Sequence, residues 1–346
     1  MAHSFDIGRR AFVGATAAAL APSAVMADDV FTTPLPQGLR PAPPNARRVA
    51  VPYELWHYDA DWAGKPEPQR PWGHPSLGYY ASDNQEIVRK HAQMLVGAGV
   101  DYIFLDWSNN IHTDNRTGQG DHTTLSIERA ALALAETYAT LPTRPNISIF
   151  IGFPQDHAAV TNGALQDKAD QVHAQFVANP RSAPLMEHLD GKPLLLVYAD
   201  TPSAYPHGLP PWRDPRFTVR YMTGFLTQQP SLLGPRLLSR YGYWSWEDRG
   251  AQTLAGVDGV ADCMTVVAAW RGSGSPGRAG GATFREEWRR ARRAGPRTVF
   301  LNGFNEWKRH EQPSPDISKD IEPSTEFGSL YLDITREQIA AFKAGR

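Results

Sequence analysis

The chain has few of the residues that several classes of protein depend on. Cys263 is the only cysteine among 346 residues, so no disulfide can form within the chain, and its apolar surroundings predict a place in the core. Lys and Arg number 35 against 36 Asp and Glu, so the formal net charge is −1 and no basic excess is available to bind nucleic acid. Beyond the N-terminal segment, no apolar run is long enough to span a bilayer. We therefore expect a soluble, globular protein without nucleic acid partners or a membrane span.

Several catalytic motifs are also missing. The histidines form no H-E-x-x-H motif and no pair at helical spacing, and no calcium-binding loop occurs, so we expect neither a metal nor another cofactor. No G-x-S-x-G elbow follows a strand, which argues against a Ser-His-Asp hydrolase. Residues 272–277 spell G-x-G-x-x-G, but they lie late in the chain and Pro276 interrupts them, so we interpret them as a flexible loop.

The N-terminus has the pattern of an export signal. Arg9-Arg10 precedes a short, alanine-rich apolar run that ends in small residues typical of a cleavage site. Residues 1–27 are therefore predicted to be a twin-arginine signal peptide that directs the protein to the periplasm or beyond. A proline-rich leader follows at 28–48, and we expect it not to pair in a sheet. Residues 49–346 are expected to form one catalytic domain, and the protein is expected to be a monomer.

Short apolar runs alternate with helical patterns from residue 49 onward. Their apolarity is continuous, which is typical of parallel strands covered on both faces. The predicted strands are 49–56, 102–107, 147–153, 194–200, 217–224, 241–246, 263–270 and 299–304, and the predicted helices are 82–99, 125–141, 164–178 and 284–294. Eight strands favour an α/β fold of the (β/α)8 TIM barrel type with degenerate helices in the second half, and an open doubly wound sheet is the alternative.

The helix at 82–99 carries clear signals at both ends. Asp83 and Glu86 have the spacing of a capping box, and Gly99 is typical of a helix stop. The apolar residues between them recur on one face, as expected of a helix that covers a sheet.

Carboxylates and indoles recur where the predicted strands end. In a TIM barrel the functional site lies at the C-terminal ends of the strands. Carboxylates can bind sugar hydroxyls or act as acid and base, and indole rings stack on pyranose faces, whereas any single tryptophan can equally be a core residue. The candidate substrate-binding residues at these ends are Glu54, Trp56, His57, Asp106, Trp107, Trp244, Trp246, Glu247, Trp270, Arg271 and Trp307.

The most informative stretch is the last predicted strand and the residues after it. The strand leads through Asn305 to Glu306, and a second carboxylate, Glu311, follows within a short loop. Cleavage of a glycosidic bond needs two carboxyl groups, one to protonate the leaving oxygen and one to act as a base or nucleophile. Two solvated glutamates in a surface loop are the alternative. Glu306 and Glu311 are our candidate catalytic residues.

Two parts of the sequence resemble a known family. Residues 75–83, including Tyr80, together with His91 and residues 98–107, resemble the first third of the endo-α-mannosidases of glycoside hydrolase family 99. The Asn305-Glu306-Trp307 element, followed by Ile321-Glu322-Pro323 and residues 327–332, also resembles the WbsX-like relatives of that family from polysaccharide gene clusters. Between residues 110 and 295 only the order of strands and helices is similar.

The resemblance implies a barrel enzyme that cleaves internal α-linkages with retention. It implies that Glu306 acts as a base on the sugar 2-hydroxyl and that a glutamate three residues later is the acid/base. Position 309 is Arg309 in this chain, so either the acid is Glu311, Glu322 or a carboxylate from another strand, or the chemistry differs from that of the family. Tyr80, Asn305 and Glu322 join the candidate substrate-binding residues.

The expected substrate is a polysaccharide or oligosaccharide, with bacterial exopolysaccharides as candidates. Lys308, Arg309 and Arg271 near the predicted site would suit an acidic saccharide. Two further functions remain open, a non-catalytic saccharide-binding protein and a polysaccharide lyase. Retention predicts that the two catalytic carboxyl groups lie about 5 to 6 Å apart.

Overall fold

The computed structural model describes most of the chain. The described residues are 34–57, 71–108, 122–153, 157–199, 202–246, 252–270, 275–307 and 314–346, with the backbone alone at 122–126. The predicted signal peptide at 1–27 and residues 272–274 of the glycine-rich loop at 272–277 lie outside them. Among the described residues, no helix has the length and apolarity needed to cross a membrane.

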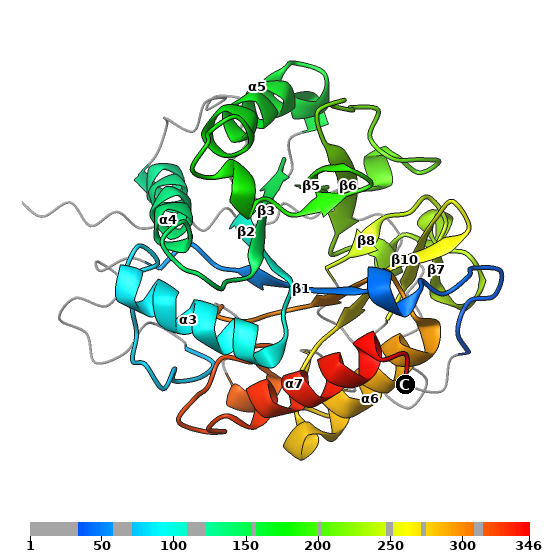
Figure 1. Cartoon of the computed structure of the whole chain (residues 1–346). Helices are drawn as coiled ribbons and strands as arrows, with labels where there is room; N and C mark the ends of the chain where they lie inside the picture. The colour runs from blue at the N-terminus through cyan, green and yellow to red at the C-terminus, as the bar shows by residue number, and fades with distance from the viewer. Residues whose placement is uncertain are drawn as a thin grey trace, which may run out of the picture.

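Parallel strands form a nearly closed barrel at the centre of the molecule (Figure 1). In wall order they are β10 (Val260–Val266), β11 (Thr298–Leu301), β1 (Arg48–Tyr53), β2 (Tyr102–Trp107), β3 (Asn146–Gly152), β5 (Lys192–Tyr198), β6 (Thr218–Thr223) and β8 (Trp244–Ser245). Side-chain hydrogen bonds join the two ends of this order, because the Thr265 hydroxyl donates to the Ser245 carbonyl and Trp244 Nε1 donates to Asp262 at 2.9 Å. The predicted barrel is confirmed, and each of its eight strands overlaps a predicted one.

Three short strands extend this wall. β9 (Leu254–Val257) pairs antiparallel with β10, and β7 (Leu238–Ser239) pairs with β9. β4 (His188–Leu189) forms a small hairpin with β5. None of the three was predicted, because runs of two to four residues carry too little periodicity to be recognised.

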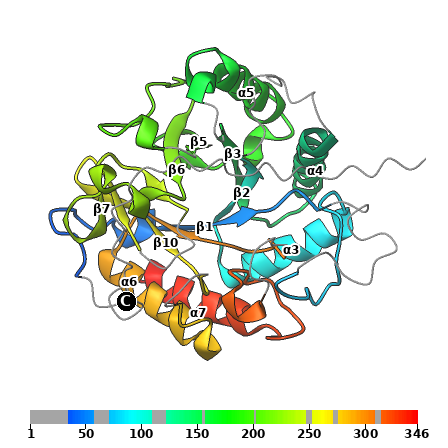
Figure 2. The same ribbon diagram turned by 180° about the vertical axis from the view of Figure 1, so that it is seen from behind.

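Helices surround the barrel unevenly. They are α3 (Gln85–Ala98), α4 (His122–Tyr138), α5 (Ala164–Val172), α6 (Ala282–Ala294) and α7 (Leu330–Lys343). Between β6 and β8 the described chain forms β7 and three short 3₁₀ turns, η6 (Leu226–Gln228), η7 (Pro230–Leu232) and η8 (Pro235–Leu237), two of which begin with proline. A helix that began at η6 could not continue through these prolines, because proline lacks the N–H that bonds to the preceding turn, so the predicted degeneracy of the second half is confirmed here. The reverse view shows the same distribution of helices around the strands (Figure 2).

Two local predictions need correction. Asn84, not Asp83, caps α3, because its side chain accepts hydrogen bonds from the N–H groups of Glu86 and Ile87. In the leader, Arg40 forms an isolated bridge with Val260, although we expected no sheet pairing there. Arg40 is not itself a proline, so its N–H is free to donate to the carbonyl of Gly259 at 2.9 Å. The predicted stop of α3 at Gly99 is confirmed by its left-handed φ of 87°.

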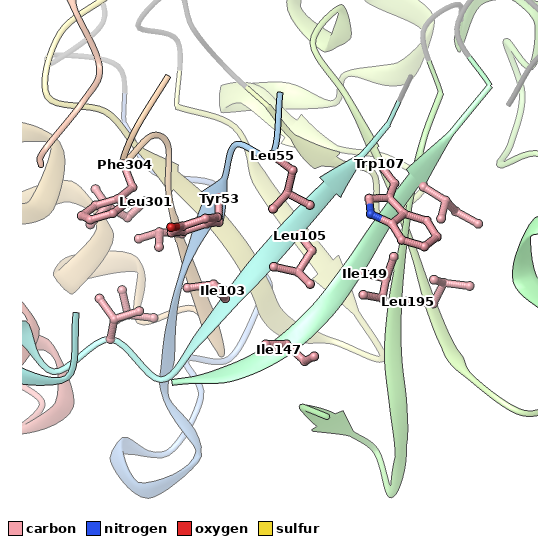
Figure 3. Close-up of a cluster of buried hydrophobic side chains, with 14 of the residues drawn as sticks. Tyr53, Leu55, Ile103, Leu105, Trp107, Ile147, Ile149, Leu195, Leu301 and Phe304 are labelled. Atoms are coloured by element: carbon pink, nitrogen blue, oxygen red, sulfur yellow. The ribbon is translucent and has the colours of Figure 1, made fainter. Parts of the chain in front are cut away.

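Alternation along the strands divides the apolar side chains into two cores. On β2, Ile103, Leu105 and Trp107 face outward and join the core beneath the helices (Figure 3). Tyr102 and Phe104 face inward and fill the barrel interior. The buried Cys263 belongs to this inner core, as the sequence predicted. Successive strand residues point to opposite faces, so the position of a residue in this alternation decides whether it can reach the barrel mouth.

Candidate active site

Acidic side chains gather at the C-terminal ends of three neighbouring strands. The strands β11, β1 and β2 lie side by side, and the β1–β2 register pairs Tyr53 with Leu105. The next residues along these two strands are Glu54 and Asp106, which therefore lie next to each other. Every second side chain of these strands points into the barrel. Asp106 is the next inward position after Tyr102 and Phe104 on β2, and Glu54 is an inward position in line with Ala50 on β1. Glu306 follows β11, so this edge of the barrel carries three acidic residues.

Asn305 joins the end of β11 to the end of β1. Its side-chain oxygen accepts a hydrogen bond from the backbone N–H of Glu54 at 2.9 Å, and its amide nitrogen donates to the Glu54 carbonyl at 3.3 Å. The Asn305 carbonyl lies 2.8 Å from Nε2 of His57. Asn305 is fully buried, so it fixes the backbone of both neighbouring glutamates. The structure gives it this positioning role in place of the predicted direct contact with a substrate.

Two residues from the segment before α7 hold Glu306. Nζ of Lys319 lies 3.4 Å from Oε2 of Glu306. The carboxylate of Asp320 accepts hydrogen bonds from the backbone N–H groups of Glu306, at 2.7 Å, and Trp307, at 2.9 Å. Lys319 and Asp320 are each 2% exposed. Glu306 is thus fixed through its backbone and has a buried cation beside its carboxylate.

Lys319 also links Glu306 to an aromatic surface. Its Nζ lies 5.0 Å from the ring centroid of Trp246 and donates to the side-chain oxygen of Asn302 at 3.3 Å. Trp246 stacks on Phe150, with centroids 5.5 Å apart and planes at 15°. Lys319 contacts both Trp246 and Glu306, so the indole lies close to the candidate catalytic carboxylate. The indole is only partly buried, as contact with a sugar ring requires.

The carboxyl groups at the mouth are in unequal electrostatic surroundings. Burial raises the pKa of Glu54 well above its ordinary value, and the charges of Asp106 and Glu306 raise it further. Burial also raises the pKa of Asp106, while hydrogen bonds from Ser108 oppose this rise. Burial and the charge of Glu306 raise the pKa of Asp320 to about 6. Glu54 therefore keeps its proton to a higher pH than an ordinary glutamate.

Glu322 occupies a separate, closed network. One of its carboxylate oxygens accepts hydrogen bonds from Tyr80 Oη and Trp307 Nε1, both at 2.6 Å, and the other lies 2.9 Å from His91 Nε2. The Glu322 and His91 side chains have no exposed area. Glu322 is therefore committed to holding Tyr80 and Trp307, which corrects its predicted role as a substrate ligand or alternative acid.

Two predicted tryptophans lie away from the mouth. Trp107 follows Asp106 and so faces outward, where its ring packs on Phe176 at 5.8 Å and beneath Lys168. Trp244 faces inward but bonds to Asp262, near the start of β10 and away from its C-terminal end. Both predictions were wrong, because a position near a strand end does not by itself place a side chain at the site.

The other predicted residues fall into two groups. Trp56 is partly buried, and His57 is 3% exposed with its ring edge-on to Tyr80. Trp270 is 3% exposed. Their predicted contacts with a saccharide stay predictions. Glu247, Arg271 and Glu311, with the neighbouring cations Lys308 and Arg309, lie outside the described residues.

Sequence reasoning missed Lys319 and Asp320. They lie in an irregular segment with no helical or strand periodicity, and their only signal was adjacency to the Ile321-Glu322-Pro323 motif. Within the part of the chain that the structure describes, no three His, Cys, Asp or Glu side chains gather in a way that could hold a metal ion.

Among the comparisons with known proteins, the similarity to solved structures is the one that supports the fold. No known protein family's sequence profile matches the chain, and no curated protein matches it. The family 99 endo-α-mannosidase from Bacteroides thetaiotaomicron, solved with bis-tris-propane, is similar with a TM-score of 0.58 and 16% identity over 86% of this chain and 98% of that one. A second structure of that enzyme gives 0.57, with the same identity and coverage. A glycoside hydrolase-like protein gives 0.53, with 13% identity over 91% of this chain and 99% of that one. The chain therefore has the barrel fold of these glycoside hydrolase structures.

Proposed function

We propose that this protein is a glycoside hydrolase that cleaves bonds within a polysaccharide or oligosaccharide. The observation that carries the proposal is the position of Glu306, which lies at the C-terminal mouth of the barrel beside Lys319 and next to the acidic pair Glu54 and Asp106. Glycosidic cleavage requires two carboxyl groups with different protonation, and this mouth supplies them. The similar fold of the family 99 endo-α-mannosidase supports the same reaction class.

In the proposed reaction Glu306 is the base, and the configuration at the anomeric carbon is retained. Glu306 removes the proton of the sugar 2-hydroxyl, whose oxygen bonds to the anomeric carbon as the leaving group departs. Lys319, with its Nζ 3.4 Å away, forms an ion pair with the carboxylate of Glu306. The partly buried indole of Trp246, beside Lys319, offers an aromatic contact for a sugar ring. Glu311 stays our sequence-based candidate for the acid.

Two further predictions belong to this proposal. The Arg9-Arg10 pattern supports export by the twin-arginine pathway to the periplasm or beyond, where extracellular polysaccharides are accessible. The proposed substrates include bacterial exopolysaccharides and α-mannans. We also propose that the protein acts as a monomer.

The test is to measure turnover and binding on the same glycans. Purified protein and its Glu306→Gln variant are incubated with a panel of bacterial exopolysaccharides and α-mannans, and products are analysed by mass spectrometry. We expect oligosaccharides from the parent alone, with glycan binding retained by the variant. Binding without any release by the parent would indicate a saccharide-binding protein, and products with ultraviolet absorbance from a new double bond would indicate a lyase.

A further inference from the structure

We propose that Glu54 is the proton donor of the reaction, with Asp106 as the residue that positions its proton. This inference rests on the proposed function, because a proton donor has meaning only if a glycosidic bond is cleaved. It assigns the acid to a strand end that the family resemblance does not indicate, and it replaces Glu311 in that role.

The position of Glu54 suits a donor. The residue lies one place beyond β1, which is the strand between β11 and β2, so Glu54 sits between Glu306 and Asp106. Its backbone is fixed by Asn305 on one side, and Ser82 Oγ donates to its carbonyl at 3.3 Å. Its side chain continues the inward alternation of β1 and is 5% exposed, so its carboxyl group points into a nearly dry mouth.

Asp106 lies next to Glu54, because the β1–β2 register pairs the residues before them. Two adjacent carboxyl groups in a nearly dry place repel when both are ionised, so one of them holds a proton more tightly. Asp106 accepts a hydrogen bond from the backbone N–H of Ser108 at 2.7 Å, which favours its ionised form. This assigns the proton to Glu54, with Asp106 beside it as the group that orients it.

Glu54 and Glu306 have neighbours of opposite charge. Lys319 forms an ion pair with Glu306. Glu54 is buried between two acidic neighbours, and its pKa is raised well above the ordinary value. An acid and a base require different surroundings, and these two carboxyl groups have them.

Two other buried carboxyl groups are committed to different contacts. Asp320 accepts hydrogen bonds from the backbone of Glu306 and Trp307 and from Nε1 of Trp72. Glu322 is enclosed by Tyr80, His91 and Trp307 in the network described above. Both hold other residues in place, so among the acidic residues that the structure describes at this mouth, Glu54 is the one we assign as the proton donor.

The proposed steps balance in protons and electrons. The bond between the anomeric carbon and the glycosidic oxygen breaks, its electron pair stays with the oxygen, and that oxygen takes the proton of Glu54. Glu306 holds the proton of the 2-hydroxyl while the 2-oxygen bonds the anomeric carbon. Water then attacks that carbon and gives a proton to Glu54, and the 2-oxygen regains its proton from Glu306. The net reaction is one glycoside and one water to two alcohols.

The test compares two leaving groups across three variants. Glu54→Gln, Glu306→Gln and Glu311→Gln are assayed on the glycan that the parent cleaves and on the α-glycosyl fluoride of the same sugar. Fluoride needs little protonation to leave. We expect Glu54→Gln to lose roughly 10²–10⁴-fold in rate on the glycan but less than about tenfold on the fluoride. Glu306→Gln should lose activity on both substrates, and Glu311→Gln should not show the selective loss on the glycan that Glu54→Gln shows.

A second measurement needs no substrate. The parent at neutral pH should show the infrared C=O stretch of a protonated carboxyl group, and Glu54→Gln should lack it while Glu311→Gln keeps it. Asp106→Asn removes a negative charge beside Glu54, so the alkaline limb of the pH–rate profile should move to lower pH. Circular dichroism of each variant verifies its fold.

The outcomes separate this inference from the proposed function. A selective loss on the glycan in Glu311→Gln, with normal rates in Glu54→Gln, would overturn the assignment of the donor and leave the glycosidase standing. A parent inactive on every glycan and fluoride would overturn the function and the donor role together. Absence of the infrared band at neutral pH would show that Glu54 is ionised and would contradict this inference alone.

Discussion

Glu54 and Asp106 lie next to each other at the inner face of the barrel mouth. Their proximity follows from the strand register, which pairs Tyr53 with Leu105 and so makes the next residues neighbours. A buried pair of carboxyl groups holds one proton between them because two adjacent charges would repel in a medium of low dielectric constant. The retained proton has measurable consequences for stability.

The stability of the parent should fall with rising pH because of Glu54. Its pKa is raised in the folded protein, so the folded state binds more protons than the unfolded state above the ordinary glutamate value of 4.5. The free energy of unfolding of Glu54→Gln, relative to the parent, should therefore increase above pH 4.5 by up to about 1.4 kcal/mol per pH unit. Asp320, with its pKa raised to about 6, acts with the same sign in both proteins and cancels. Urea unfolding at several pH values measures this difference, and a constant difference would contradict the prediction.

Lys319 should matter for both stability and catalysis. Lys319→Met removes the cation 3.4 Å from Glu306, and loss of one partner of a buried ion pair typically costs about 3–5 kcal/mol. Lys319 also lowers the pKa of Glu54, so its removal should move the alkaline limb of the pH–rate profile to higher pH. Lys192→Met at an exposed position is the control and should change stability by less than about 0.5 kcal/mol. Equal behaviour of the two variants would contradict the role given to Lys319.

Asn305 should act through the backbone of Glu54. Asn305→Ala leaves the N–H of Glu54 without its partner in a buried place, at a cost of about 1–3 kcal/mol, while the Glu54 carbonyl keeps the hydroxyl of Ser82. The rate should fall as well, because Glu54 loses its fixed position. Asn45→Ala at an exposed position is the control and should be nearly neutral. Thermal unfolding and glycan turnover measure both effects, and an unchanged melting temperature in Asn305→Ala would contradict this account.

The two tryptophans Trp107 and Trp246 should respond differently to truncation. Trp107→Ala opens a cavity in the outer core against Phe176 and should cost about 3–5 kcal/mol, with unchanged glycan affinity of the folded protein. Trp246→Ala removes the partly exposed indole near Glu306 and should weaken glycan binding. Calorimetric titration of both variants with a bound glycan measures the affinities. A weaker affinity in Trp107→Ala than in Trp246→Ala would reverse our assignment.

The sequence was sufficient to predict the barrel because its strands are continuous apolar runs. β2 was predicted with its observed bounds, 102–107, since four apolar or aromatic residues lead to Asp106 and Trp107. β8 was harder, because only Trp244 and Ser245 pair with a neighbouring strand. The final helix, α7, was not predicted, although Tyr331, Ile334 and Phe342 form a buried face. Residues 327–332 were assigned only to the family motif, although the apolar residues from 331 onward have helical spacing.

A site residue could be predicted where it directly follows a strand. It could not be predicted where it belongs to an irregular segment far away in the sequence. Glu54 and Asp106 could be placed because strand register and alternation carry them to the mouth. Trp107 could have been excluded by the same alternation, which places it opposite Asp106. Lys319 and Asp320 reach Glu306 through an irregular segment, and no local pattern specifies such a path.

The most direct test of the central claim is hydrolysis in water labelled with oxygen-18. A glycosidase whose reaction depends on Glu306 should release oligosaccharides that carry one labelled oxygen at the new reducing end, and the Glu306→Gln variant should release none. Mass spectrometry of the products from a cleaved exopolysaccharide or α-mannan measures the label. Unlabelled products, or equal release by the parent and the variant, would contradict the proposal that Glu306 catalyses hydrolysis in this barrel.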